Sequence, residues 1–205
     1  GRLGPAHSPD FFCLSGTGLR SRIWILRNDL PISSLRGPIE EALSGNCRRW
    51  ILTAPTGSGK STQVPQMILD SQPFRDGKEV LVLQPRRLAA RLLAQWVSMD
   101  RGGRLGAEVG YQIRFENRTG PETRLRFITE GILLRRMLTD PNLEGVGAVI
   151  LDEFHERHLY TDLTLGRIKA LQEERRPDLL LVVMSATLEV KPLQVYFGES
   201  LFLES

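Results

Sequence analysis

Two short segments carry side chains that together could transfer a phosphoryl group. The first, Ala54–Ser61 (APTGSGKS), is a glycine-rich loop that ends in a lysine and a hydroxyl residue. The second, Asp152–His155 (DEFH), directly follows the apolar run Ala148–Leu151. A loop that can surround phosphates and two carboxylates at the end of a strand are the two halves of a phosphoryl-transfer site. Together they predict magnesium-dependent hydrolysis of a nucleotide.

The glycine-rich loop has the residues that a phosphate-binding loop requires. Gly57 and Gly59 allow the backbone to curl so that successive N–H groups face phosphate oxygens, and the helix that follows adds the positive end of its dipole. We expect Lys60 to reach the β and γ phosphates. We expect the Ser61 hydroxyl to ligate Mg²⁺, in preference to Thr62, which lies one position further along the helix.

The loop departs from the usual pattern at its first position, where Ala54 replaces glycine. The departure is mild because Ala54 ends a strand and needs no positive φ. A chance match in a turn-rich stretch is the alternative, but a predicted strand before the loop and a predicted helix after it argue against it. The expected nucleotide-binding residues of this segment are Pro55, Thr56, Gly57, Ser58, Gly59, Lys60, Ser61 and Thr62.

The acidic pair has two separable tasks. Asp152 is placed to hold Mg²⁺ through water, and Glu153 to accept a proton from the attacking water. The alternative is that Asp152 only caps a helix that begins at Glu153. That alternative leaves unexplained why the capped turn follows a fully apolar strand in a chain with a phosphate loop. The expected catalytic residues are therefore Lys60, Asp152 and Glu153, and the expected metal site is Ser61, Asp152 and Glu153.

The composition predicts one folded α/β domain. The chain has 205 residues, of which 41% are hydrophobic and 25% are charged, which is ordinary for a globular protein. Its 27 basic residues comprise 23 Arg and 4 Lys. Arginine suits phosphate geometry, so this bias favours nucleic acid as a partner. Solvated arginines on helix faces explain the same bias equally well.

Cysteine usage and hydropathy argue against other classes of protein. Cys13 and Cys47 lie far apart without His or Cys partners at metal-ligand spacing, so we expect neither a disulfide framework nor a zinc site. A reduced, cytoplasmic location fits best. The apolar stretches near the start, Phe11–Leu14 and Ile23–Leu26, are too short for a signal peptide or a membrane span. We therefore expect no insertion into a membrane.

The chain divides into a tail and one domain. Residues 1–28 mix Gly, Pro, Ser and Arg without periodicity, which predicts a poorly ordered tail or linker. Residues 29–205 alternate apolar runs with amphipathic stretches, the pattern of a mainly parallel sheet with helices on both faces. The predicted strands are Trp50–Ala54, Glu79–Gln84, Arg124–Thr129, Ala148–Asp152 and Leu179–Ser185. The predicted helices are Ile39–Ser44, Ser61–Leu69, Leu88–Met99, Glu130–Leu138, Asp162–Glu174 and Val190–Phe197.

The predicted elements bring the motifs together. In open parallel sheets, ligands bind at the carboxyl ends of strands, and the phosphate loop, Asp152 and Ser185 all fall at strand ends. Ser185, Ala186 and Thr187 would then place small hydroxyl side chains beside the γ phosphate. Serine and threonine at a strand end commonly only begin a helix, but the presence of the other motifs in order favours the functional interpretation.

In their order and content these motifs resemble the first motor domain of superfamily 2 helicases of the DEAH-box group, with Asp152–His155 as the signature box. The resemblance runs from about Leu30 to the end of the chain. Phe154, where the family more commonly has alanine, points to its HrpB-type branch. The resemblance implies a RecA-like P-loop NTPase fold. The residues that carry it are Ala54–Thr62, Gln84–Arg91, Val109–Arg114, Thr129–Gly131, Leu151–Asp162 and Met184–Leu188.

The resemblance implies a binding site for a single RNA strand. In the family, the segments that match Pro85–Arg87 and Thr129–Gly131 contact the RNA backbone, and Arg114 matches a residue of a loop that touches the strand. Arginine offers phosphate a planar fork of donors, and a helix start offers neutral donors. The alternatives are a solvated helix start for the first segment and, for Arg114, a salt bridge to Glu116 or Glu108. The implied contacts are Pro85, Arg86, Arg87, Arg114, Thr129, Glu130 and Gly131.

A coupling role for His155 is also implied by the resemblance. In the family this histidine connects the nucleotide site to the strand-binding surface, and the matching partners here are Ser185, Ala186 and Thr187. His155 thus joins the expected catalytic residues without taking part in the chemistry itself. The alternative is a buried histidine that is merely hydrogen-bonded.

Trp96 is a departure from the family. It occupies the position where many DEAH-box proteins have an arginine that stacks on the nucleotide base. An indole can also stack on a base, without hydrogen bonds to the base edge. We therefore expect Trp96 to bind the base of ATP and of other nucleoside triphosphates. The alternative is core packing, because an aromatic residue on an amphipathic helix usually faces inward.

The sequence therefore predicts the amino-terminal motor half of an ATP-dependent RNA helicase. Its expected ligands are ATP, Mg²⁺ and single-stranded RNA, with DNA left open because the implied contacts are mainly to the backbone. We expect a monomer. Full activity should need the arginine fingers of a second RecA-like domain, and the motifs of such a domain do not follow Thr187. This chain alone should therefore be a weak ATPase. The alternatives are a P-loop ATPase of another class and a nucleotide-gated nucleic-acid-binding module.

Overall fold

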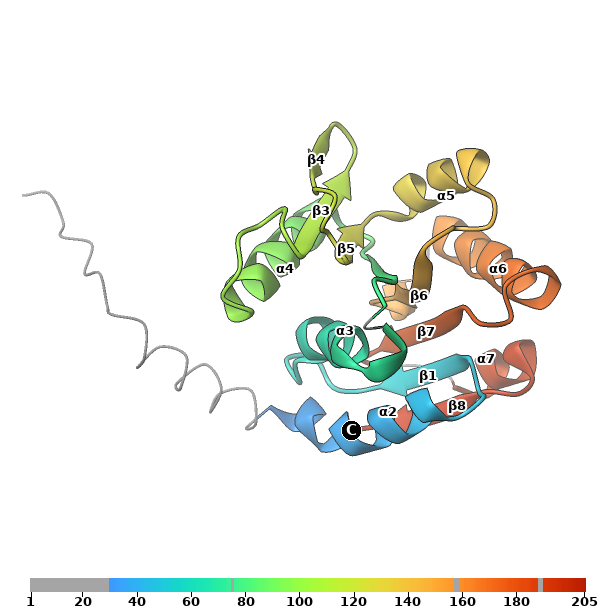
Figure 1. The fold of residues 1–205 in the computed structure, drawn as a ribbon. Coiled ribbons are helices and arrows are strands. Elements are labelled where there is room, and N and C mark those ends of the chain that lie inside the picture. Colours follow the sequence, from blue (N-terminus) through green and yellow to red (C-terminus); the bar gives the residue numbers. More distant parts are fainter. Residues whose placement is uncertain (1–29, 75, 157–158, 188–189) are drawn as a thin grey trace, which may run out of the picture.

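A twisted sheet forms the centre of the protein (Figure 1). The computed structural model describes residues 30–74, 76–156, 159–187 and 190–205, so the predicted tail and Leu188 lie outside the described residues. Within the described part, eight strands lie in the order β4-β3-β5-β2-β6-β7-β1-β8, and only the β3–β4 pair is antiparallel. The strands are β1 Arg49–Thr53, β2 Glu79–Leu83, β3 Val109–Ile113, β4 Glu116–Arg118, β5 Leu125–Ile128, β6 Val146–Leu151, β7 Leu180–Ser185 and β8 Leu201–Glu204.

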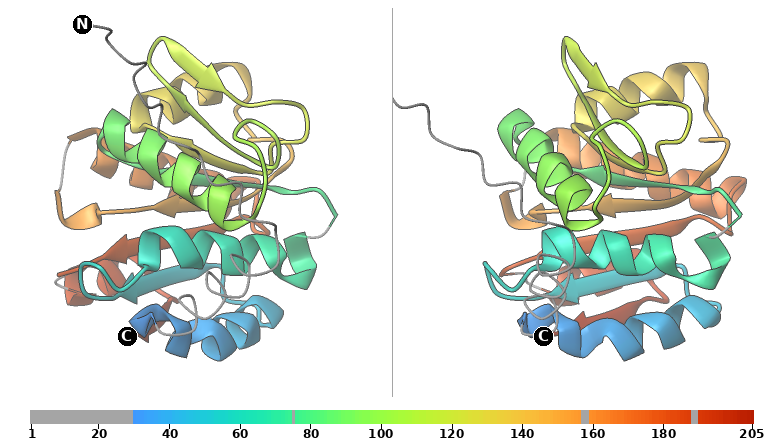
Figure 2. Two further views of the ribbon diagram at one scale, coloured as in Figure 1. Left: turned by 90° about the vertical axis from the view of Figure 1, so that its left-hand side faces the viewer. Right: turned by 60° about the vertical axis from the view of Figure 1, so that its left-hand side comes forward.

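Helices cover both faces of the sheet. One hydrophobic cluster joins α2, α3 and α4 to one face, and a second cluster joins α5, α6 and α7 to the other. Figure 2 shows α3 and α4 on the near side of the sheet. The α-helices are α2 Arg36–Ser44, α3 Lys60–Asp70, α4 Arg87–Asp100, α5 Glu130–Thr139, α6 Leu159–Glu174 and α7 Val190–Phe197. Short 3₁₀ turns are η1 Pro31–Leu35, η2 Gln72–Phe74 and η3 Phe154–Glu156.

The central strands are buried along their whole length and mainly apolar, because helices cover both of their faces. All residues of β2, β6 and β7 are buried. Successive side chains of a strand point to opposite faces, so in β6 Ala148 and Ile150 pack on the α2–α4 side while Val149 and Leu151 pack on the α5–α7 side. The sheet therefore gives the residues at its strand ends a rigid base.

The predicted fold class, a mainly parallel sheet with helices on both faces, is confirmed, and so are all five predicted strands and six predicted helices. The prediction lacked β3, β4 and β8. In β3 the apolar pattern is interrupted by Gly110 and Gln112, β4 is only three residues long, and β8 is an edge strand with exposed residues. Among the described residues, none of the helices has the length and apolar composition to cross a membrane.

The carboxyl ends of four strands carry candidate residues. The phosphate loop follows β1, Gln84 follows β2, Asp152 follows β6, and β7 ends in Ser185. These strands are neighbours in the order β2-β6-β7-β1. Because all four run in the same direction, the candidate residues meet at one edge of the sheet, where open parallel sheets bind their ligands.

Candidate functional site

The phosphate loop has a backbone shape that only glycine adopts readily. Gly57 has φ 79° and Gly59 has φ 92°, both in the left-handed region. At Gly59 a Cβ atom would also lie 2.8 Å from Cδ1 of Leu30, so a side chain has no room there. The Gly59 carbonyl accepts hydrogen bonds from the N–H groups of Thr62 and Gln63, at 3.2 Å and 2.8 Å, which start α3 directly at the loop.

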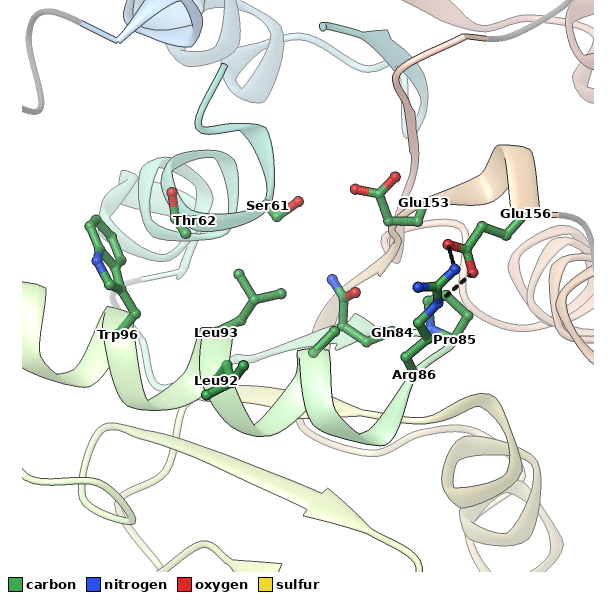
Figure 3. A pocket seen from close by; sticks show the side chains of 11 residues that line it. Ser61, Thr62, Gln84, Pro85, Arg86, Leu92, Leu93, Trp96, Glu153 and Glu156 are labelled. Atoms are coloured by element: carbon green, nitrogen blue, oxygen red, sulfur yellow. Dashed lines mark hydrogen bonds and ion pairs between the residues drawn. The ribbon is translucent and has the colours of Figure 1, made fainter. Parts of the chain in front are cut away.

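Lys60 and Glu153 face each other at the centre of this edge. Lys60 is only 3% exposed, and its Nζ lies 3.4 Å from Oε1 of Glu153. Glu153 has φ 52°, a left-handed conformation that costs a non-glycine residue about 1 to 3 kcal/mol. Strain of this kind is concentrated at functional sites. Figure 3 shows the Glu153 carboxylate directed across the pocket towards Ser61.

Asp152 is buried at the end of β6 and accepts hydrogen bonds from several donors. Nε2 of Gln84 donates to Oδ2 at 2.5 Å, and the backbone N–H of Glu153 donates to Oδ1 at 2.9 Å. Ser61 forms a further side-chain hydrogen bond with this carboxylate. Burial raises the pKa of Asp152, while the hydrogen bond with Ser61 and the charge of Lys60 oppose the rise. The carboxylate is therefore held in one orientation beside a hydroxyl and a cation.

Ser61 and Asp152 offer the kind of oxygen ligands that Mg²⁺ prefers. Their side chains are in hydrogen-bond contact, and hydroxyl and carboxylate oxygens are hard ligands. In the described part of the chain, no group of three or more His, Cys, Asp and Glu side chains could hold a metal on its own. Magnesium sites in nucleotide enzymes commonly use one or two protein ligands together with phosphates and water. The residues present fit such a site.

A pocket of about 650 Å³, which we call the nucleotide pocket, opens beside the phosphate loop (Figure 3). Ser61 and Thr62 of α3, Leu92 and Trp96 of α4, and Glu153 are among its lining residues. Ligand pockets typically measure about 300 to 1,000 Å³, so this one can hold a nucleotide. Trp96 is 46% exposed and lies on the Thr62 side of the pocket, so its indole is accessible to a ligand instead of being buried in the core.

His155 connects the acidic motif to the third motif. Its Nδ1 lies 3.4 Å from Oγ of Ser185 and 3.4 Å from Oε2 of Glu153. The Ser185 hydroxyl is buried and donates to the backbone carbonyl of Thr187 at 3.0 Å, with the half-buried Ala186 between them. The structure thus brings together residues from both predicted motifs in one chain of contacts.

A second pocket, of about 450 Å³, lies where the starts of α4, α5 and α6 meet the turn between β3 and β4. We call it the basic pocket. The elements that surround it are labelled in Figure 1. Six of the seven residues predicted to bind nucleic acid line it: Pro85, Arg87, Arg114, Thr129, Glu130 and Gly131. The structure therefore gathers in one place residues that the sequence only suggested separately.

Arg86, the seventh predicted residue, lines the nucleotide pocket instead. Its guanidinium forms an ion pair with Glu156, with N–O distances of 2.8 Å and 3.3 Å (Figure 3). Arg86 precedes α4 and Arg87 begins it, so their side chains leave the backbone in different directions. Pro85 lines both pockets and forms a wall between them.

The salt bridges considered for Arg114 are not formed in the structure. Glu116 pairs with Arg91 and accepts a hydrogen bond from Tyr111 at 2.5 Å. Glu108 pairs with Arg101, with an N–O distance of 2.7 Å. The guanidinium of Arg114 instead lies over the ring of its neighbour Phe115, 4.6 Å from the ring centroid. Arg114 therefore keeps its charge available to a ligand.

The sequence-based site prediction lacked four polar residues that line these pockets: Gln84, Glu156, Arg135 and Tyr160. Gln84 lay within a recognised motif, and Glu156 within another, but neither was assigned a function. Arg135 lies four residues after Gly131 on α5, so helical spacing could have placed both on one face. Tyr160 lies in the same motif segment as Glu156, but that segment does not place it beside α5, because its position depends on how α6 packs against α5.

Comparisons with known proteins agree with this geometry. A family model described as "DEAD/DEAH box helicase" matches residues 38–195. The crystal structure of Escherichia coli DEAH/RHA helicase HrpB is similar to this one with a TM-score of 0.81 and 42% sequence identity, covering 86% of this chain and 22% of that chain. The predicted RecA-like fold and the resemblance to DEAH-box helicases of the HrpB type are confirmed.

The similar sequences are named as RNA helicases. "ATP-dependent RNA helicase HrpB" of Escherichia coli is 44% identical over 174 residues, which are 84% of this chain and 21% of that protein. "Probable ATP-dependent RNA helicase DHX35" of Homo sapiens is 42% identical over 175 residues, 85% of this chain and 25% of that protein. "Probable ATP-dependent RNA helicase DHR2" of Saccharomyces cerevisiae is 40% identical over 184 residues, which are 87% of this chain and 25% of that protein. The chain thus spans about a quarter of these relatives.

Proposed function

The chain belongs to the DEAD/DEAH box helicase family, and we propose that it is the ATP-binding motor domain of an ATP-dependent RNA helicase. The observation that carries this proposal is that two pockets share one wall, at Pro85. One pocket is lined by the Ser61 hydroxyl and the Glu153 carboxylate and opens beside buried Lys60, as a phosphoryl-transfer site requires. The other is lined by arginines that suit a phosphate backbone. A motor that moves along a strand needs both sites in contact.

Hydrolysis begins, in this proposal, when Glu153 accepts a proton from the water that attacks the γ phosphate. Lys60 Nζ lies 3.4 Å from Oε1 of Glu153, so a γ phosphate bound by Lys60 would compete with that carboxylate for the lysine. Binding of the phosphate would thereby free Glu153 to act as a base. The base then becomes available only when a nucleotide is present.

The other residues of the nucleotide pocket bind and orient the substrate. Ser61 and Asp152 would hold Mg²⁺, which neutralises charge on the β and γ phosphates when it is bound. The hydrogen bond from Gln84 fixes the Asp152 carboxylate for this task. Gly57 allows backbone N–H groups to face the phosphates, and Trp96 stacks on the base of ATP or of another nucleoside triphosphate. Pro55, Thr56, Ser58, Gly59 and Thr62 complete the nucleotide-binding set.

His155 transmits the state of the nucleotide pocket to the strand-binding surface. It contacts both Glu153 and Ser185, so a change at the γ phosphate alters its position. The third motif, Ser185–Thr187, then moves with it. The single strand binds to Pro85, Arg86, Arg87, Arg114, Thr129, Glu130 and Gly131.

We further propose that residues 29–205 form the first of two RecA-like domains, with residues 1–28 as a tail. The second domain supplies arginine fingers, which are worth about 10³- to 10⁵-fold in the rate of related nucleotide hydrolases. This chain on its own is therefore a weak ATPase, and unwinding requires the longer protein. The partner is single-stranded RNA, and the same contacts to the backbone also allow DNA to bind. The protein acts as a monomer in the cytoplasm.

The test compares ATP hydrolysis with and without single-stranded RNA and DNA, in this chain and in the longer protein that contains it. We expect RNA to stimulate hydrolysis by the longer protein, and Glu153→Gln to abolish that hydrolysis because the amide cannot accept the proton. The matched control is Glu122→Gln, which removes an exposed carboxylate that lines neither pocket. Hydrolysis that is indifferent to either strand would contradict the helicase proposal and leave an ATPase of another class.

A further inference from the structure

Tyr160 is an exposed aromatic residue in the basic pocket to which the sequence analysis assigned no function. Its side chain is 62% exposed although it lies in the second position of α6, directly at the pocket that the arginines line. Its neighbour Leu159 is 81% exposed and does not line the pocket. Single exposed apolar residues are common on protein surfaces, so exposure alone does not distinguish Tyr160, whereas its place in the lining of the basic pocket does. Tyr160 is therefore a candidate contact residue.

The charges of the basic pocket select an anionic ligand. Arg87, Arg114 and Arg135 line it, and within the described residues none of the three takes part in an ion pair with a carboxylate. Glu130 also lines the pocket, and its carboxylate is 8% exposed and accepts a hydrogen bond from Thr161 at 3.2 Å. One carboxylate against three guanidinium groups leaves the pocket with a net positive charge. Three guanidinium groups around one aromatic ring match a ligand that carries both phosphates and flat apolar faces.

The position of Tyr160 is fixed by the packing of two helices. The hydroxyl of Thr161 donates to Oε1 of Glu130, which ties the first turn of α6 to the first residue of α5. Buried Leu133 of α5 and Leu165 of α6 belong to one hydrophobic cluster and hold the same pair of helices together. Tyr160 is thus kept beside Thr129 and Gly131 at the start of α5. A residue held in this way contributes stacking without a large loss of conformational entropy.

We propose that Tyr160 stacks on a base of the single strand whose phosphates the arginines of the basic pocket bind. This inference rests on the proposed function and adds a base contact to a surface that otherwise reads the backbone. Every base has a π face, so stacking of this kind is tolerant of sequence. The basic pocket therefore binds unpaired nucleotides in any sequence and disfavours a duplex, whose bases are already stacked on each other.

The first test measures binding of fluorescent oligouridylate to the 205-residue chain at low salt. Tyr160→Ala should weaken binding about 5- to 150-fold, the range for loss of one base–aromatic stack, and Tyr160→Phe should bind like the wild type. Leu159→Ala is the matched control, because it removes an even more exposed apolar side chain that does not line the pocket, and it should leave affinity unchanged. Thermal unfolding of each variant verifies that the fold is retained. Equal affinity of Tyr160→Ala and the wild type would overturn the inference.

Two further measurements separate stacking from a general loss of the pocket. On an abasic strand, which keeps its phosphates, Tyr160→Ala and the wild type should bind equally, and an undiminished difference would overturn the inference. Arg135→Ala should lower the slope of log affinity against log salt by about 0.7, whereas Tyr160→Ala should leave it unchanged. If the wild-type chain binds no strand at all, the proposed function fails together with this inference. If it binds and only the Tyr160 effect is missing, the inference alone fails.

Discussion

The nucleotide pocket and the basic pocket share Pro85 but hold their charged groups in opposite ways. Beside the first, Lys60 and Asp152 adjoin the lining residues Ser61 and Glu153, and each is 3% exposed and has polar partners. In the second, Arg87 and Arg114 are exposed. Buried charges must be paired, whereas exposed charges need no partner. The contrast suggests that the first pocket is preorganised for chemistry, and that the second adapts to a flexible chain.

The largest effect is expected in the preorganised pocket. Lys60→Ala should lower kcat for ATP hydrolysis by about 10²- to 10³-fold, because it removes a fixed donor that stabilises charge on the γ phosphate. It also removes the partner of Glu153. Phosphate release under saturating ATP measures the effect, in the longer protein with RNA present. A loss of less than tenfold would show that this lysine is not part of a preorganised site.

Substitution of Trp96 should have an intermediate effect. Trp96→Ala is expected to weaken the binding of ATP, GTP, CTP and UTP by a similar factor, about 2- to 10-fold, because stacking on an indole uses no base-edge hydrogen bonds. Trp96→Phe should retain most of the affinity. Competition binding and hydrolysis at saturation with all four nucleotides test this. The stacking hypothesis fails if the wild type hydrolyses ATP many-fold faster than the other three.

The smallest effect is expected for a single arginine of the basic pocket. Arg87→Ala should reduce the slope of log affinity for single-stranded RNA against log salt by about 0.7, because one phosphate contact is lost. The melting temperature should not change, since Arg87 is exposed and has no ion pair among the described residues. The control is Arg104→Ala, an exposed arginine outside both pockets. A lower melting temperature for Arg87→Ala would show that this arginine stabilises the fold, which would contradict the contrast between the two pockets.

The sequence predicted the nucleotide pocket better than the basic pocket, for a physical reason. Its polar residues Ser61, Gln84 and Glu153 come after β1, β2 and β6, and buried strands such as β2 and β6 appear in the sequence as short, mainly apolar runs. Once the strands are known, a parallel sheet places their ends side by side. The strand pattern does not predict the role of Gln84, because the hydrogen bond from Gln84 to Asp152 joins residues that are 68 positions apart.

The basic pocket depends on helix packing, which short-range patterns do not specify. Thr161 and Glu130 are 31 positions apart, and their hydrogen bond determines where Tyr160 lies. The same limit applies to Arg86, which the sequence grouped with Arg87 because they are neighbours in the chain. The direction in which each side chain leaves the start of α4 separates them into different pockets.

The left-handed backbone of Glu153 has a consequence for engineering the protein. Replacement of a non-glycine residue at positive φ by glycine removes backbone strain, and among the described residues a search for positive φ angles selects Phe115, Leu143 and Glu153 alike. At Glu153 the relief of strain would come with the loss of the carboxylate that we propose as the general base. A variant that unfolds at a higher temperature would thus be inactive, so selection for thermal survival and selection for turnover act in opposite directions at this single position.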